Sequence, residues 1–97
     1  MHQTLPPGSV RIGRVTRMFP NKQCVGITAT CAGFGVPTTL FAECNTDGPR
    51  SRSFTVTSMQ RDRKPIDHVD KGESCALYLG VDRDHLPPHG SIIYIVP

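Results

Sequence analysis

The chain of 97 residues is the size of one small domain, and its 37% hydrophobic and 20% charged residues exclude an intrinsically disordered chain. Its formal net charge of +3 makes it mildly basic. The first residues lack the basic and apolar regions of a signal peptide, and the longest strongly apolar run, residues 92–96, is too short to span a membrane. We therefore expect a cytoplasmic protein that does not enter a membrane and whose four cysteines are thiols.

The N-terminal third predicts a β-hairpin. Nine glycines and nine prolines penalise helices, and no window of ten residues keeps a helical hydrophobic period. Residues 1–8 are expected to be a flexible arm. In residues 9–19, Val10 and Ile12 are out of step with Val15 and Phe19, so a β-bulge near Gly13 is predicted. Residues 20–23 predict a proline-led turn, and residues 24–31 alternate with a period of two.

The rest of the chain predicts four more strands. Residues 32–37 read as a loop, and residues 38–60 as a second hairpin with its turn at Asp47-Gly48-Pro49. The first strand of that hairpin carries Leu40, Ala42 and Cys44 on one face. A charged link at 61–73 follows, and the last strands are expected at 74–81 and 91–96.

Six strands without a covering helix favour closure of the sheet, because closure removes the exposed edges. We predict a single all-β domain over residues 1–97: a small, closed, six-stranded antiparallel β-barrel with a Greek-key-like order. Pro65-Ile66 and Val69 are expected to plug one opening of this barrel. The side chains predicted to face inward are Ile12, Val15, Val25, Ile27, Leu40, Phe54, Val56, Ile66, Val69, Leu77, Leu79, Ile92, Tyr94 and Ile95.

Three segments, IGRVTRMF at 12–19, VGITATCAG at 25–33 and the stretch at 54–94, carry a resemblance to a known family. Their order resembles the second β-barrel domain of translation GTPases in the elongation factor Tu and initiation factor two superfamily. The same domain type is similar to the C-terminal barrel of U32 peptidase-like enzymes. The chain departs from the family at residues 35–37, where Gly-Val-Pro replaces a Gly-Asp pair, and in a longer connection at 45–52.

The resemblance implies a translation-protein barrel that contacts ribosomal RNA or holds the aminoacylated 3′ end of tRNA. It also implies that Gly72 and Cys75 border a pocket, although Cys75 equally fits the core pattern. The chain has no phosphate-binding loop and no Asn-Lys-x-Asp motif, so we expect it neither to bind nor to hydrolyse GTP.

Basic residues gather in two blocks, and a patch of this kind is typical of surfaces that bind polyanions. Arginine can pair with a phosphate through two parallel hydrogen bonds and can stack on an unpaired base. An equally simple interpretation is a solvated surface whose charges discourage aggregation. The residues predicted to bind nucleic acid are Arg14, Arg17, Arg52, Arg61, Arg63 and Lys64.

Catalytic and metal chemistry find little support in the residue spacing. The cysteines form no C-x-x-C pair, and two prolines between His85 and His89 exclude a helical ligand pair, so neither a metal nor a cofactor is expected. Cys75 or Cys24 with His68 would need a third group to orient the base. We therefore expect no enzyme.

The leading hypothesis is a non-catalytic, translation-factor-like module that binds structured RNA, tRNA or the ribosome through a basic face formed by residues 52–64. The alternatives are a protein-interaction module, such as an accessory barrel beside a U32 peptidase-like enzyme, and a minimal cysteine enzyme.

Overall fold

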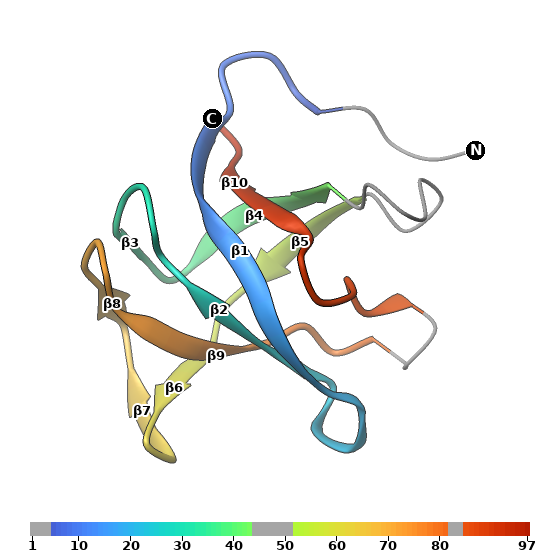
Figure 1. Ribbon diagram of the computed structural model, residues 1–97, viewed down its shortest axis with the longest axis vertical. Coiled ribbons are helices and arrows are strands. Elements are labelled where there is room, and N and C mark those ends of the chain that lie inside the picture. The colour runs from blue at the N-terminus through green and yellow to red at the C-terminus, as the bar shows by residue number, and fades with distance from the viewer. Residues whose placement is uncertain (1–4, 44–51, 82–84) are drawn as a thin grey trace.

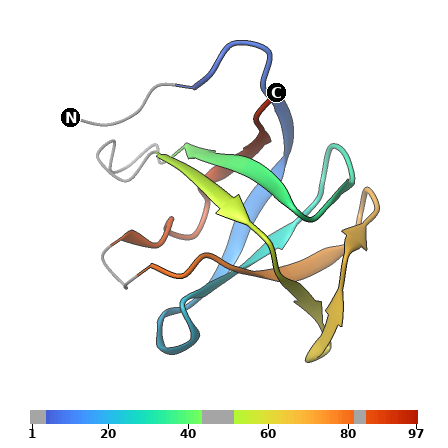
Figure 2. The same ribbon diagram turned by 180° about the vertical axis from the view of Figure 1, so that it is seen from behind.

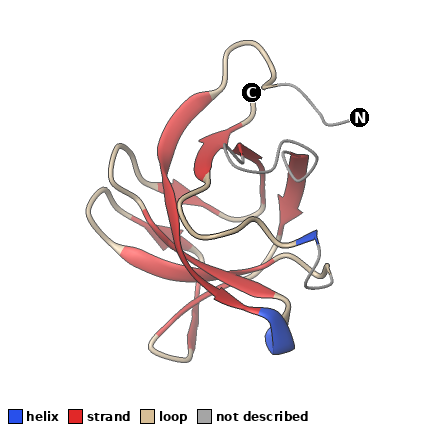
Figure 3. Ribbon diagram, turned by 45° about the vertical axis from the view of Figure 1, so that its right-hand side comes forward, coloured by secondary structure: helices blue, strands red, loops and turns tan. Residues whose placement is uncertain are grey.

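The structure, a computed structural model, describes residues 5–43, 52–81 and 85–97, and these residues are almost entirely strands and loops (Figure 3). The predicted all-β class is therefore confirmed. Within the described residues the strands are β1 (Val10–Phe19), β2 (Cys24–Thr28), β3 (Phe34–Gly35), β4 (Thr38–Glu43), β5 (Arg52–Val56), β6 (Met59–Arg61), β7 (Lys64–Ile66), β8 (His68–Val69), β9 (Ser74–Tyr78) and β10 (Ile92–Ile95), with a 3-10 helix η1 (Pro20–Lys22) after β1.

Eight of these strands form one strongly curled antiparallel sheet in the order β5-β4-β10-β1-β2-β9-β6-β7 (Figure 1). The remaining two, β3 and β8, pair with each other. The long strand β1 lies near the middle of the order, between β10 and β2, so the first and last strands of the chain are neighbours. Both predicted hairpins are present, as β1–β2 and β4–β5.

The predicted closed six-stranded barrel is wrong, because the sheet is an eight-stranded half-barrel with β5 and β7 at its edges. No ladder joins these two edges among the described residues. The chain itself runs from one end of the sheet to the other, since only Thr57 and Ser58 separate β5 from β6 (Figure 2). The charged link at 61–73 contains β7, β8 and the last residue of β6, which were not predicted, while its charged side chains are exposed or only partly buried. These strands have two or three residues each, too few to show a period.

The bulge predicted near Gly13 is confirmed, and a second bulge follows it. The register of β1 shifts between Arg11 and Gly13 against β10, and between Val15 and Arg17 against β2. Each bulge adds one residue and so reverses the alternation of side chains. Ile12 and Val15, three positions apart, therefore both reach the core and are fully buried.

Most of the predicted core is confirmed. Nine of the fourteen predicted side chains are buried, and Ile66, Leu79 and Ile95 are half-buried against the same cluster. The prediction is wrong in β10, where Ile93 is buried at 3% exposure while Ile92 and Tyr94 are only half-buried. This strand is apolar on both faces, so its period cannot define the register. The nine buried residues are Ile12, Val15, Val25, Ile27, Leu40, Phe54, Val56, Val69 and Leu77.

The expected plug is only partly present. Val69 is fully buried and pairs with Phe34 across the β3–β8 ladder. Pro65, in contrast, is exposed on the edge strand β7, where a residue without an N–H group suits an edge. The predicted Cys44 and the turn at 47–49 lie outside the described residues. Across the described ranges no helix is long and apolar enough to cross a membrane.

Gly13 gives the first test. A Cβ at this position would lie 1.9 Å from the Thr28 carbonyl oxygen, so Gly13→Ala must displace the backbone of β1 or β2. We expect a loss of about 3 kcal/mol in the free energy of unfolding, measured by urea denaturation. The matched control is Gly90→Ala, where no atom lies within 4 Å and only the positive φ of +90° is strained. That control should lose about 1–2 kcal/mol. Equal losses in both variants would contradict the bulge geometry.

Candidate functional site

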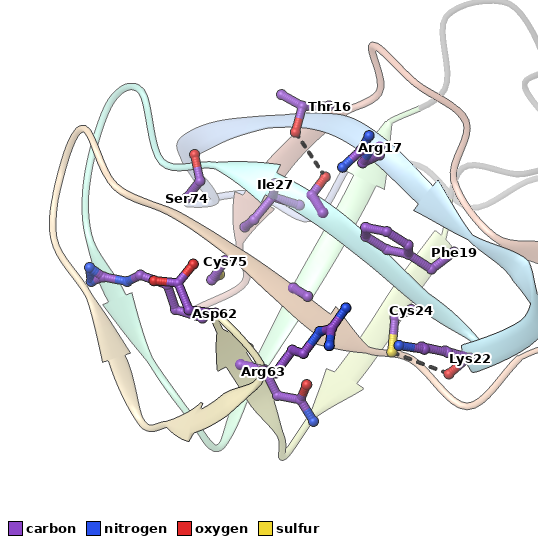
Figure 4. Close-up of a pocket in the computed structure, with 14 residues that line it drawn as sticks. Thr16, Arg17, Phe19, Lys22, Cys24, Ile27, Asp62, Arg63, Ser74 and Cys75 are labelled. Atoms are coloured by element: carbon purple, nitrogen blue, oxygen red, sulfur yellow. Dashed lines mark hydrogen bonds between the residues drawn. The ribbon is translucent and has the colours of Figure 1, made fainter.

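A groove of about 670 Å³ lies on the outer face of the sheet, over β1, β2, β9 and β6 (Figure 4). One row of side chains crosses these strands: Arg17 pairs with Gly26, Gly26 with Ala76, and Ala76 with Gln60. The two central residues of this row, Gly26 and Ala76, are the two smallest amino acids, whereas the outer residues have long side chains. Small side chains in the middle of a row leave a hollow, so Gly26 and Ala76 form the floor of what we call the outer groove.

The bulge in β1 turns Arg17 and Phe19 toward this groove. A Cβ on Gly26 would lie 3.2 Å from Arg17 Cβ and 3.5 Å from Phe19 Cε2, so these two side chains cover the outward side of Gly26. Val25 and Ile27, the neighbours of Gly26 on β2, are buried in the core on the opposite face. The Thr16 hydroxyl, at the bulge itself, donates to the Gly26 carbonyl oxygen at 3.4 Å.

Four cations line the outer groove: Arg17, Lys22, Arg61 and Arg63. Arg17, Lys22 and Arg63 form no ion pair with any residue that the structure describes. Arg17 and Lys22 belong to the β1–η1 side of the groove and Arg63 to the β6–β7 turn, so the charges face the hollow from two walls (Figure 4). Opposed cations around one hollow attract an anion more strongly than scattered ones.

Arg61 is held in place by an acidic partner. Both terminal nitrogens of its guanidinium donate to Glu73 Oε2 at 2.6 Å, while Glu73 Oε1 accepts from the backbone N–H of Asp70 at 2.7 Å. The side chains of Arg61 and Glu73 are 39% and 34% exposed. Arg61, one of the residues predicted to bind nucleic acid, is therefore already paired with a carboxylate. This arginine anchors the β6 strand to the turn before β9, and Glu73 compensates its charge.

Arg63 stands at a strained turn. Asp62 and Arg63 have φ angles of 53° and 66°, and they form the two-residue loop between the paired residues Arg61 and Lys64. Such loops favour asparagine and glycine, because other side chains are strained at positive φ. An arginine in this position is locally unfavourable, and observed backbone strain of this kind is common at functional sites.

Phe19 is a groove residue that the sequence analysis did not identify. The guanidinium carbon of Arg17 lies 5.8 Å from the centroid of the Phe19 ring, within the range of a cation–π contact. The Arg17 guanidinium thus lies over the Phe19 ring, and the pair places a cationic and an aromatic group at one side of the groove. Arg17 and Phe19 both face the groove because of the second bulge in β1. No pattern of apolar residues in β1 indicates this bulge, so the sequence carries no signal for their position.

Cys75 belongs to the core and to the groove at once. It is 7% exposed, packs in the core cluster, and also lines the groove. Burial raises the pKa of its thiol to about 11, and the nearby Arg61 charge only partly opposes this rise. The folded state therefore keeps a proton that the unfolded chain releases, and this thiol lowers stability as pH rises from about 9 to about 11. At the other end of the groove, burial also raises the pKa of Cys24.

The other predicted binding residues are divided between several surfaces. Arg14 is exposed on β1 beside Thr28, and Lys64 is exposed on β7, but neither lines the groove. Arg52 was expected near the β6 block, yet it pairs with Ala42 on the edge strand β5, at the other end of the strand order. Gly72 lies in the turn before β9, where its N–H donates to the Ala29 carbonyl oxygen, and it is not part of the groove.

The candidate catalytic and metal residues are not brought together. His68 Nε2 lies 2.7 Å from Asp70 Oδ1, and no hydrogen bond joins His68 to Cys24 or Cys75 in the described part of the chain. In residues 5–43, 52–81 and 85–97, no group of three histidine, cysteine or acidic side chains could hold a metal ion. No protein-family model matches this chain, and no curated protein matches it significantly.

The thiols offer a test of the groove floor. With a pKa of about 11, only about one Cys75 thiol in 1,000 is ionised at pH 8, and the thiolate is the reactive form. We expect iodoacetamide at pH 8 to label the exposed Cys31 at least ~100-fold faster than Cys75, as measured by mass spectrometry of the peptides. In urea, where the chain is unfolded and Cys75 is no longer buried, the labelling rates of Cys31 and Cys75 should become similar. Fast labelling of Cys75 in the folded protein would instead support a reactive thiol.

Proposed function

We propose that the chain is a non-catalytic module that binds RNA through the outer groove. The observation that supports this proposal is the set of three cations without ion-pair partners among the described residues, Arg17, Lys22 and Arg63, around one open hollow. RNA carries regularly spaced phosphates, and arginine and lysine bind phosphates by charge-assisted hydrogen bonds.

The groove offers more than charge. In the Arg17–Phe19 pair the guanidinium carbon lies 5.8 Å from the centroid of the ring. Bases stack both on aromatic rings and on guanidinium planes. An acidic protein surface would find the same cations but would make no use of a stacking surface. This difference favours RNA over a protein partner as the occupant of the groove.

The class of RNA comes from the resemblance to the second barrel domain of translation GTPases. It makes tRNA or ribosomal RNA the proposed ligand, and a translation-factor-like module the proposed class. The interaction-module alternative, including an accessory barrel beside a U32 peptidase-like enzyme, predicts a partner protein at the same cations. Co-purification with and without ribonuclease distinguishes them, because a partner held through RNA is lost after digestion and a directly bound protein is retained.

The salt dependence of binding tests the proposal. With three or four phosphates neutralised, the logarithm of affinity for a fluorescein-labelled RNA should fall with the logarithm of salt concentration at a slope of about −2 to −4. Arg17→Gln should weaken binding about tenfold and reduce the slope by about one. The matched control is Arg11→Gln, which removes the same charge from an exposed position of β1 outside the groove.

A second variant separates binding from stability. Arg63→Gly removes a groove cation and at the same time relieves a non-glycine residue at a φ of 66°. We expect the free energy of unfolding to rise by about 1 kcal/mol while RNA affinity falls about tenfold. Salt-independent binding, or equal losses for Arg11→Gln and Arg17→Gln, would overturn the proposal.

A further inference from the structure

A second aromatic ring lies in line with Phe19 on the outer face of the sheet. Phe19 pairs with Cys24 across the β1–β2 ladder, and Cys24 pairs with Tyr78 across the β2–β9 ladder. Tyr78 is 47% exposed, which makes it one of two large apolar residues with such exposure in the described part of the chain. Tyr78 does not line the groove itself, but its ladder partner Cys24 does, and so exposed an aromatic side chain has no role in the core.

The Tyr78 ring is held in position without being covered. Its hydroxyl donates to Gln23 Oε1 at 3.3 Å, and the backbone N–H of Leu79 donates to the Gln23 carbonyl oxygen at 3.0 Å. A Cβ on Gly80 would lie 3.4 to 3.6 Å from three atoms at the end of this side chain, so the ring lies beside a residue with no side chain. The ring is thus anchored at its hydroxyl while much of its surface meets solvent.

The sheet sets the spacing of Phe19 and Tyr78, and their rings extend in opposite directions from this row, because the Phe19 ring lies beside Gly26 and the Tyr78 ring lies beside Gly80. Phe19 and Tyr78 are two strands apart, and neighbouring strands are separated by roughly 5 Å, so the two residues lie roughly 10 Å apart. Successive bases in a stacked strand are about 3.4 Å apart. Two adjacent bases can therefore occupy both rings only if the strand is unstacked and extended.

We propose that the outer groove takes single-stranded RNA, with one base stacked on Tyr78 and another on the Arg17–Phe19 pair. This inference rests on the RNA-binding function proposed above and defines the form of RNA that the groove accepts. Lys22 lies in η1, the turn between Phe19 and Cys24, and so provides a phosphate contact close to both rings. Arg63 provides a second contact from the opposite wall.

A duplex fits this arrangement poorly. In a duplex the bases are paired and stacked on one another, so their faces cannot reach side-chain rings, and A-form RNA is recognised mostly through its backbone. Duplex RNA could contact only the cations of the groove rim. The two aromatic rings therefore distinguish single-stranded from double-stranded RNA, whereas the cations bind both.

The experiment compares a fluorescein-labelled oligouridine with the same strand annealed to oligoadenosine, for the wild type and two variants of Tyr78. The wild type should bind the single strand at least ~10-fold more tightly than the duplex. Tyr78→Phe keeps the ring and should keep this affinity within about twofold, whereas Tyr78→Leu should lose about tenfold for the single strand and less than about twofold for the duplex. The salt slope should not change in either variant, because no cation is removed.

A base analogue reports the contact directly. An oligouridine carrying one 2-aminopurine should lose fluorescence on binding, because stacking quenches this base, and the quenching should decrease in Tyr78→Leu but not in Tyr78→Phe. If single strand and duplex bind equally and only Arg17→Gln and Arg63→Gly weaken them, the single-strand inference fails and the RNA-binding proposal stands. If neither RNA binds with a salt-dependent affinity, both fail.

Discussion

Two β-bulges in β1 determine which side chains reach the outer face of the sheet. The first, at Gly13, lets Ile12 and Val15 both enter the core. The second, between Val15 and Arg17, brings Arg17 into register with Gly26 and turns it away from the core. Without this second extra residue, strict alternation would direct Arg17 inward with Val15, at the cost of burying a charge. The cationic wall of the outer groove therefore depends on one additional residue in one strand.

The groove itself exists because the two residues in the middle of this row on the outer face have the smallest side chains. Gly26 and Ala76 occupy the centre of a row whose ends are Arg17 and Gln60. Behind this floor, the core face of the same strands is filled with large apolar side chains, so the hollow does not weaken the packing. The Arg61–Glu73 contact holds β6 beside the turn before β9. A rigid floor and a strained, charged turn at Arg63 together form a site that is preorganised for an anion.

The sequence predicted the all-β class, both hairpins and the bulge at Gly13, because alternation, glycine and turn residues are local signals. It did not predict the open edges of the sheet, because the strands within residues 59–69 are too short to show a period. Of the candidate site, Arg17, Arg61 and Arg63 were named from charge alone. Phe19 and the floor were missed because their meeting depends on ladder register, which a local pattern does not encode. Arg52 was misplaced for the same reason, since the strand order sends β5 to the far edge.

The proposed function requires that a ligand enters the hollow above Gly26 and Ala76. Solution NMR of the labelled protein tests it directly, by following backbone amide signals while oligouridine is added. Binding in the groove should shift the signals of Gly26, Ala76 and Cys24 progressively and should leave those of Gly72 and of β5, at the far edge, unchanged. Shifts confined to β5 or to the turn at Gly72, with the groove floor unchanged, would contradict it.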